Sequence, residues 1–410
     1  MSRVSEPLCP VRVPEPSSAA APAPRGRSSG TAALPGPAPA GDAPLPEPAA
    51  AEDAEGPAPR TTGDRPVVLL SGSSGIVGEA VAYALRRDFH VVALRGRRAG
   101  AYVHEDLPVD LAHPRLGLDS RAWDALVARA DVVVHAAGRA RYDGHSDEFQ
   151  CVNVSGSRRM AELAAAAGAP LIHLSSAFVD RVGQARDAAA AIPDTCPVTP
   201  LTYLESKVAA ERAVAASDAL TCVVRPSLVM GDSDTGRTPE LGFVHEHIKM
   251  LLSGVATSMC GPHQRVDMVP RDIVARAVAA LVSLAVHDPR RLPSRYWATS
   301  GPAALTCAEF GDIVTDVGRR GGLRLAAPDF HDPAKAALAD YPDWDVLEPR
   351  LRSVLAAQAA GSTILGAGEI LPTSFGSREV PGAPAPVTVR QAQQHLEVNA
   401  RALLDAAPGA

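Results

Sequence analysis

Tyr203 and Lys207 stand four positions apart, a spacing that places both side chains on one face of a helix. An ammonium group beside a phenol lowers the phenol pKa, which makes the tyrosine a usable general acid. A carbonyl that receives a hydride gains negative charge on its oxygen, which a proton donor and a second hydrogen-bond donor must neutralise. Ser176, after a predicted strand, is the candidate second donor. We therefore predict a catalytic set of Ser176, Tyr203 and Lys207.

A glycine-rich segment, residues 71–78, follows the predicted strand 67–70 and opens a predicted helix. Its glycines, Gly72, Gly75 and Gly78, form a Gly-x-x-Gly-x-x-Gly pattern. The first glycine permits a tight turn, the second lets backbone amides approach a pyrophosphate, and the third lets helix and strand pack closely. The positive end of the helix then faces the phosphates. This arrangement predicts a dinucleotide site.

The end of the second predicted strand indicates which dinucleotide binds. An acidic residue there would bind the ribose hydroxyls and repel a 2′-phosphate, but this chain has Arg95, Arg97 and Arg98. Guanidinium groups suit the additional phosphate of NADP, and the hydroxyls of Ser73 and Ser74 could assist them. An ordinary solvated turn is the alternative interpretation. Asp110 and Leu111, after a third strand, are expected beside the adenine. 

Short β-branched runs alternate with Ala-rich helical stretches from residue 65 onward. Continuous apolar strands separated by helices predict a doubly wound parallel sheet, an α/β Rossmann fold. The predicted strands span residues 67–70, 90–94, 131–135, 171–174 and 221–224. The predicted helices between them span residues 78–87, 121–129, 146–167 and 202–217.

The chain divides into three predicted parts. Residues 1–64 are rich in Pro and Ala and are expected to be a disordered tail. Residues 65–230 form the dinucleotide-binding core with the catalytic residues. Residues 231–410 form a smaller, mostly helical substrate-side lobe with two C-terminal helices, and Asp272 is expected to cap one helix of this lobe.

Composition restricts the partners. The net charge of -6, without a basic stripe, argues against nucleic acid binding, and a small molecule is the expected partner. No apolar run approaches the roughly 18 residues that a membrane span needs, and the first residues lack the features of a signal peptide, so a cytoplasmic location is expected.

Six scattered cysteines predict mostly buried thiols rather than a disulfide framework. His245 and His247 are two positions apart, which disfavours a shared metal on a helix, and no metal is expected.

These motifs together resemble the extended short-chain dehydrogenase/reductases, and within them the branch of thioester reductase domains and fatty acyl-CoA reductases. The segments 110–118 and 225–233, followed by Thr235 and Gly236, favour this branch over the sugar-nucleotide epimerases. Ser71 stands where the family usually has threonine. The resembling segments are residues 68–78, 110–118, 135–138, 153–156, 173–179, 203–207 and 225–233.

The resemblance implies a role for each matching position. Ser176 would bond the substrate carbonyl, Tyr203 would donate the proton, and Lys207 would be its electrostatic partner. Asn153 could shape the active-site helix rather than touch substrate. The implied NADP contacts are Gly72, Gly75 and Gly78 at the pyrophosphate, Arg95 with Arg97 or Arg98 at the 2′-phosphate, Asp110 at the adenine, Ala136 near the ribose, and Pro226 and Ser227 beside the nicotinamide. The cofactor-binding set is completed by Ser73, Ser74, Ile76, Leu111, Ala137 and Lys207.

The leading hypothesis is NADPH-dependent reduction of an acyl thioester, bound to coenzyme A or a carrier protein, to an aldehyde or alcohol. The chain has no carrier attachment signature, so the acyl group would arrive on a separate carrier. Reduction of a free ketone or aldehyde would use the same residues, and a nucleotide-sugar epimerase or dehydratase is a further alternative. A non-catalytic NADPH-sensing module is the non-enzyme alternative, although such proteins commonly lack the Tyr or the Lys. The oligomeric state stays open.

Overall fold

The computed structural model describes residues 65–140, 146–191, 200–365 and 369–406. The predicted N-terminal tail, residues 1–64, lies outside the described residues. No helix within the described part has the length and apolarity needed to cross a bilayer.

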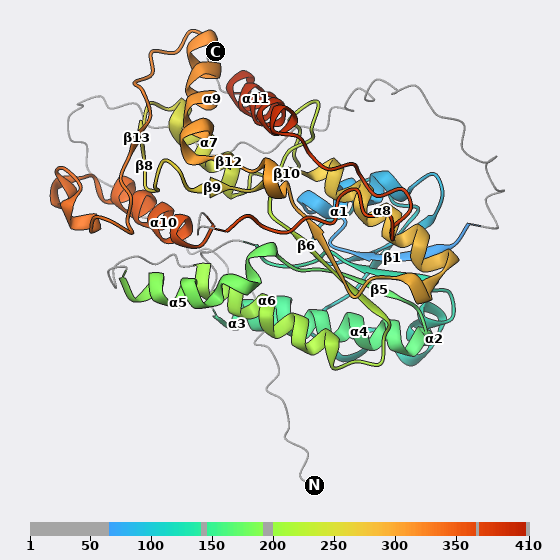
Figure 1. The fold of residues 1–410 in the computed structure, drawn as a ribbon. Helices are drawn as coiled ribbons and strands as arrows, with labels where there is room; N and C mark the ends of the chain where they lie inside the picture. Colours follow the sequence, from blue (N-terminus) through green and yellow to red (C-terminus); the bar gives the residue numbers. More distant parts are fainter. Residues whose placement is uncertain (1–64, 141–145, 192–199, 366–368, 407–410) are drawn as a thin grey trace, which may run out of the picture. The chain divides into compact units, whose positions relative to one another are not determined.

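A seven-stranded sheet, with every neighbouring pair parallel, organises the chain (Figure 1). Its strand order is β11-β6-β5-β4-β1-β2-β3. The order reverses direction between β1 and β4, and in open α/β sheets ligands bind outside the carboxyl ends of the strands at such a switch point. The strands are β1 (Val67–Ser71), β2 (His90–Arg95), β3 (Glu105–Pro108), β4 (Val132–His135), β5 (Leu171–Leu174), β6 (Thr221–Pro226) and β11 (Arg295–Ala298).

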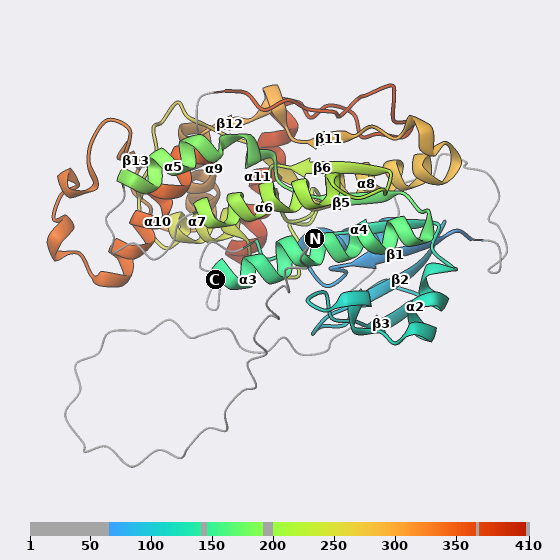
Figure 2. The same cartoon turned by 90° about the horizontal axis from the view of Figure 1, so that it is seen from below.

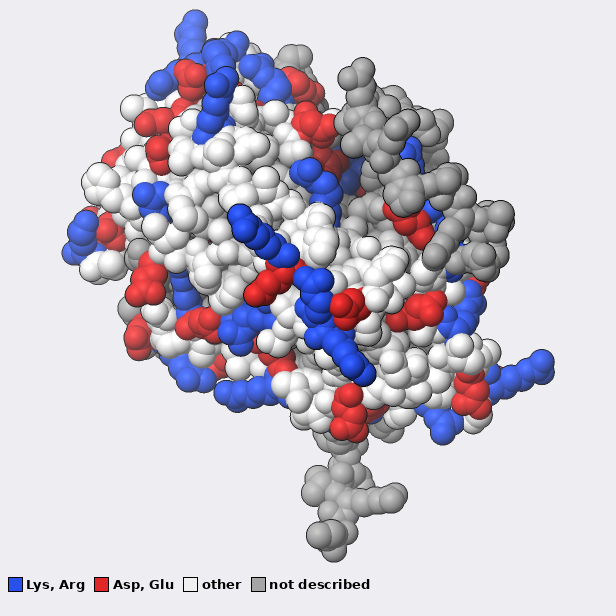
Figure 3. Space-filling model, turned by 45° about the vertical axis from the view of Figure 1, so that its right-hand side comes forward, with Lys and Arg blue, Asp and Glu red and all other residues white. Residues whose placement is uncertain are grey.

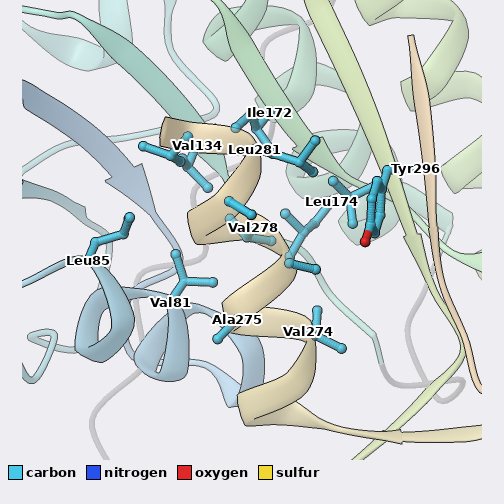
Figure 4. Close-up of a cluster of buried hydrophobic side chains, with 14 of the residues drawn as sticks. Val81, Leu85, Val134, Ile172, Leu174, Val274, Ala275, Val278, Leu281 and Tyr296 are labelled. Carbon is cyan, nitrogen blue, oxygen red and sulfur yellow. The ribbon is translucent and has the colours of Figure 1, made fainter. Parts of the chain in front are cut away.

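Helices cover both faces of the sheet because its strands are apolar on both sides. In β1, Val68 and Leu70 face a core shared with α1 and α8, whereas Leu69 faces a second core that includes α4. Figure 4 shows the first core, with side chains of α8 directed at the strands. Figure 2 shows α4 and α6 across the opposite face. The helices around the sheet are α1 (Ile76–Leu85), α2 (Ser120–Val127), α3 (Ser146–Phe149), α4 (Gly156–Ala167), α5 (Val182–Ala191), α6 (Pro200–Ala215) and α8 (Arg271–His287).

The predicted helix 146–167 is interrupted. It begins as α3, passes through a π-helical segment, η2 (Gln150–Ser155), and continues as α4. Such π-helical turns occur frequently at functional sites. Here the turn contains Asn153, which is 1% exposed.

A second layer of helices and short strands lies beside the carboxyl ends of the strands. It has its own core, in which α7, α9 and α11 pack together. α10 packs on α5. The elements are β7 (Leu228–Met230), α7 (Phe243–Leu252), β8 (Thr257–Ser258), β9 (Arg265–Val266), β10 (Met268–Pro270), β12 (Leu305–Thr306), α9 (Cys307–Arg320), β13 (Asp329–Phe330), α10 (Pro349–Leu365) and α11 (Val389–Asp405).

Two elements beyond residue 230 belong to the sheet rather than to this second layer. β11 extends the sheet next to β6, and α8 packs against α1. Residues 231–410 therefore contribute to both layers, and the three-part division of the chain stays a prediction.

Two sequence expectations are corrected locally. Pro270, not Asp272, is the N-cap residue of α8, and the Asp272 carboxylate instead accepts hydrogen bonds from the backbone N and the Oγ of Ser233, both at 2.8 Å. Cys222, Cys260 and Cys307 are buried thiols as expected, but Cys151 is disulfide-bonded.

Candidate active site

A cavity of about 200 Å³ lies at the carboxyl ends of β5 and β6. It brings together the whole predicted catalytic set, Ser176, Tyr203 and Lys207, with Pro226 and Ser227 at the end of β6. The start of α1 supplies a further wall, including Ile76 and Gly78. Ile76 and Ser227, which are 151 positions apart in the sequence, thus share one cavity.

The hydroxyl groups of Tyr203 and Ser176 meet at this cavity. Tyr203 lies on α6, is 9% exposed, and is hydrogen-bonded to the side chain of Ser176. Burial raises the pKa of Tyr203 to about 12, and the Ser176 hydrogen bond opposes this shift. The expected lowering of this pKa by Lys207 is therefore not observed: burial raises the pKa, and the opposing contribution comes from Ser176. The phenol is protonated at neutral pH, as a proton donor must be.

Lys207 is held at the end of β5. Its Nζ donates a hydrogen bond to the backbone carbonyl oxygen of Leu174 at 3.1 Å. Burial lowers the pKa of Lys207 to about 8, and the carboxylate of Glu211, one helical turn further along α6, opposes this shift. An added Cβ on Gly138 would lie 3.3 Å from both Lys207 Nζ and Asn153 Oδ1. A glycine at position 138 therefore leaves the ammonium room beside the cavity.

Asn153 joins the loop after β4 to the active-site helix. Its Oδ1 accepts a hydrogen bond from the backbone N of Arg139 at 2.8 Å, and its Nδ2 donates to Arg139 O at 3.1 Å and to Ser206 Oγ at 2.9 Å. Ser206 Oγ in turn donates to the carbonyl oxygen of Tyr203 at 2.6 Å. These bonds fit the expectation that Asn153 shapes the active-site helix.

A second, larger cavity of about 580 Å³ runs from the glycine loop to the end of β2. Gly72 has φ 78°, and a Cβ at Gly72 or Gly78 would collide with backbone atoms. Gly75 is the N-cap of α1 and has no side-chain hydrogen bond, so the first amides of this helix are left for a ligand. The walls of this second cavity include the predicted residues Gly72, Ser73, Ser74, Gly75, Leu111, Ala136 and Ala137.

Arg95, Arg97 and Arg98 line the far end of this second cavity. Arg95 Nε lies 3.1 Å from Asp106 Oδ2, and Arg98 Nη2 lies 3.1 Å from Glu240 Oε2. The Arg98–Glu240 ion pair spans the two cavities because Glu240 lines both. Sequence reasoning missed Glu240, which lies between β7 and α7 and belongs to no motif.

Asp110 is the one predicted site residue that the structure does not bring to either cavity. Its Oδ1 accepts a hydrogen bond from Ala112 N at 2.8 Å, and its Oδ2 lies 2.9 Å from His113 Nδ1. Both carboxylate oxygens of Asp110 therefore bind groups of the turn that follows Asp110 in the chain. Its neighbour Leu111 does line the second cavity.

A buried ion-pair network behind the catalytic set was also missed. Glu211 Oε1 accepts a hydrogen bond from Ser175 Oγ at 2.5 Å, and both Glu211 oxygens bind the guanidinium of Arg225, at 3.0 and 2.6 Å. The same guanidinium contacts Asp180 at 2.9 Å. Their positions in the sequence could have indicated these two residues. Glu211 follows the predicted catalytic residue Lys207 by four positions, and Arg225 directly precedes the predicted cofactor-binding residue Pro226. The network fixes the ends of β5 and β6 against α6.

The two cavities together fit a dinucleotide. The amides at the start of α1 suit a pyrophosphate, and the three arginines suit a further phosphate. Within the described residues no group of three or more His, Cys, Asp or Glu side chains is placed to hold a metal ion. On the face shown in Figure 3, basic and acidic side chains are interspersed.

Comparisons with known proteins agree with this geometry. The family described as "Male sterility protein" matches residues 105–278. The terminal R domain from the myxalamid PKS-NRPS biosynthetic pathway has a similar structure, with a TM-score of 0.59, 17% identity, and coverage of 82% of this chain and 91% of that domain. The family match and the shared fold agree with the resemblance to the extended short-chain dehydrogenase/reductases that the sequence motifs indicate.

Two further proteins are similar to this chain. A reductase (R) domain of a nonribosomal peptide synthetase from Mycobacterium tuberculosis has a TM-score of 0.55 at 19% identity, covering 86% of this chain and 94% of that domain. A ceramide reductase from Caulobacter vibrioides is 34% identical over 177 residues, which are 42% of this chain. The match spans only 50% of that relative's length.

Proposed function

We propose that this protein is a dehydrogenase/reductase, which reduces the carbonyl group of an acyl thioester, carried on coenzyme A or a separate carrier protein, to an aldehyde or alcohol with NADPH. The observation that supports this proposal is the convergence of Ser176, Tyr203 and Lys207 on one cavity that adjoins the glycine loop. The similarity to R domains of peptide and polyketide synthetases favours a thioester substrate.

In this proposal each side chain has one task. Bound NADPH would supply the hydride for the carbonyl carbon. The hydroxyls of Ser176 and Tyr203 hold the carbonyl oxygen, and Tyr203 gives it a proton as negative charge develops there. The Lys207 ammonium favours the tyrosinate that remains, because opposite charges stabilise each other in a buried site. The resulting hemithioacetal then releases a free thiol and leaves the aldehyde.

NADP rather than NAD is proposed because the cavity ends at three guanidinium groups. Arg95, Arg97 and Arg98 offer charge-assisted hydrogen bonds to a 2′-phosphate. A sugar-nucleotide epimerase, which returns its hydride to the substrate, would show no net NADPH oxidation. That outcome separates the epimerase alternative from the reductase.

A ketone carbonyl on a lipid skeleton is the second candidate substrate. The similarity to a ceramide reductase favours it, and the same Ser176 and Tyr203 hydroxyls would serve. The two candidates differ in their products, since only a thioester releases a free thiol.

The test incubates the full chain with NADPH and a panel of acyl thioesters and long-chain ketones. We expect NADPH oxidation that accompanies thiol release from thioesters, measured by absorbance and with a thiol reagent. Tyr203→Phe serves as the inactive control. NADPH oxidation with ketones alone would overturn the thioester assignment, and the absence of net oxidation with any carbonyl compound would overturn the reductase.

A further inference from the structure

A third cavity, of about 50 Å³, lies between α7, α9 and α10. It adjoins the catalytic cavity, because Leu228, Phe243 and Val244 line both. A substrate in the catalytic cavity would therefore enter the third cavity past these three residues. The other lining residues are His247, Met259, Cys260, Val266, Cys307, Phe310, Gln358, Ser362 and Leu365.

The polar side chains in this wall are already engaged with one another. Gln358 Nε2 lies 3.0 Å from His247 Nδ1, and Gln358 Oε1 accepts a hydrogen bond from Met259 N at 3.4 Å. His247 Nε2 lies 3.4 Å from Ser258 Oγ, and Ser362 Oγ donates to Ala359 O at 3.0 Å. Burial lowers the pKa of His247 to about 4, so this imidazole is uncharged at neutral pH.

The two thiols of the wall are also engaged. Cys307 and Cys260 are hydrogen-bonded to each other, and this hydrogen bond, together with burial, raises the pKa of the Cys307 thiol far above its usual value. Neither cysteine is in a disulfide bond. The cavity therefore presents apolar surface without a charged group, and a polar or charged ligand would lose its hydration there without compensation.

We propose that this third cavity binds the aliphatic end of the substrate acyl chain, so that the enzyme prefers an unbranched alkyl chain over a polar peptidyl group. This inference rests on the proposed function. A water-sized group needs roughly 10–15 Å³ of such a cavity, so the space admits on the order of four methylene-sized groups beyond Phe243. Chain length beyond that limit should add no affinity.

The test measures binding without turnover, using 1-alkanols from 1-butanol to 1-decanol as probes. Calorimetric titration of the full chain should give a dissociation constant that falls about fourfold for each added methylene until the cavity is full, and then stays level. Ser362→Leu and Val266→Phe each fill the cavity from a different wall and should abolish this length dependence. Ser353→Leu, on the same helix α10 but outside the cavity wall, is the matched control and should retain it.

The outcomes separate this inference from the proposed function. A length-independent affinity, or equal losses in Ser353→Leu and Ser362→Leu, would overturn the alkyl site. Length-dependent alcohol binding together with no reduction of any thioester would support the alkyl site and overturn the thioester assignment. Thioester reduction whose kcat/KM is the same for acetyl and octanoyl substrates, in the parent chain and in Ser362→Leu, would overturn the alkyl site alone.

Discussion

Lys207 Nζ and the carbonyl oxygen of Leu174 are joined by a hydrogen bond of 3.1 Å at the last residue of β5. The bond ties the active-site helix to the strand end from which Ser175 and Ser176 follow. The ammonium group and the predicted carbonyl-binding hydroxyl therefore keep a fixed relative position. Because both groups are buried, the protonation state of Lys207 is expected to control activity.

We predict that activity falls as pH rises through about 8. Burial lowers the pKa of Lys207 to about 8, so the ammonium form that supports Tyr203 dominates below this pH and is lost above it. A profile of log kcat against pH should bend downward near pH 8 with a slope of −1. The Lys207→Met variant should show low activity without this bend. A parent profile that stays flat to pH 10 would contradict the role of the ammonium.

Replacement of Tyr203 by Phe should lower kcat by about 10²- to 10⁴-fold, the usual contribution of a positioned proton donor. The affinity for NADPH should stay within about twofold, because the phenol acts mainly as charge develops on the substrate oxygen. Stopped-flow measurement of single turnovers, together with fluorescence titration of NADPH, checks both parts. Equal losses of kcat and of cofactor affinity would assign Tyr203 to binding instead.

The sequence was sufficient for elements with strong local patterns. β5 is observed at the predicted residues, and the glycine loop joins β1 to α1 as expected. β11 was missed because its segment, Arg295–Ala298, is short and lies after a long helical region, so only its pairing with β6 defines it. The π-helical turn around Asn153 was missed because its sequence shows ordinary helical patterning.

The site was predictable where chemistry and spacing coincide, as for Tyr203 and Lys207. It was not predictable where a contact joins segments far apart in the chain. The Arg98–Glu240 ion pair bridges 142 positions, and no local pattern marks Glu240. The sequence also does not determine whether the Asp110 carboxylate faces the cofactor cavity or forms hydrogen bonds with the adjacent residues Ala112 and His113.

Arg95→Ala should weaken NADPH binding while leaving NADH binding nearly unchanged. Hydrogen bonds to charged groups contribute about 1.5–3 kcal/mol, which corresponds to a loss of roughly 10- to 100-fold for the 2′-phosphate alone. Titration of the parent and variant with both dinucleotides measures the ratio. Glu240→Gln removes the carboxylate that holds Arg98 and should strengthen NADPH binding by a few-fold. Equal changes for NADPH and NADH would show that these residues do not read the 2′-phosphate.

Glu211→Gln should destabilise the fold more than any comparable change on the surface of α6. Arg225 is 3% exposed, and removal of one partner of a buried ion pair typically costs about 3–5 kcal/mol. Glu205→Gln on the same helix is the matched control, because Glu205 pairs with the exposed Arg186 and should contribute about 0–1 kcal/mol. Urea unfolding of both variants gives the two free energies. Similar values would mean that the Ser175–Glu211–Arg225 network does not stabilise the sheet edge.

Acid should destabilise the protein through two buried histidines on neighbouring strands. His135 and His173 stack with ring centroids 5.4 Å apart, and burial lowers the pKa of His135 to about 3 and that of His173 well below its usual value. An unfolded histidine binds a proton near pH 6.5, whereas these two stay neutral in the folded state. The unfolded state therefore binds more protons below pH 6.5, and the free energy of unfolding falls as pH decreases.

Between pH 7.5 and 5.5 each of these histidines should remove about 1.4 kcal/mol of stability, since one pKa unit corresponds to this free energy. His173→Phe keeps a ring of similar shape and should reduce the difference in unfolding free energy between these pH values by that amount. His263→Gln replaces an exposed histidine and should leave the difference unchanged. Chemical denaturation at both pH values measures this difference in unfolding free energy. The same pH dependence in the parent and His173→Phe would mean that His173 is already protonated in the folded protein, which its burial beside His135 opposes.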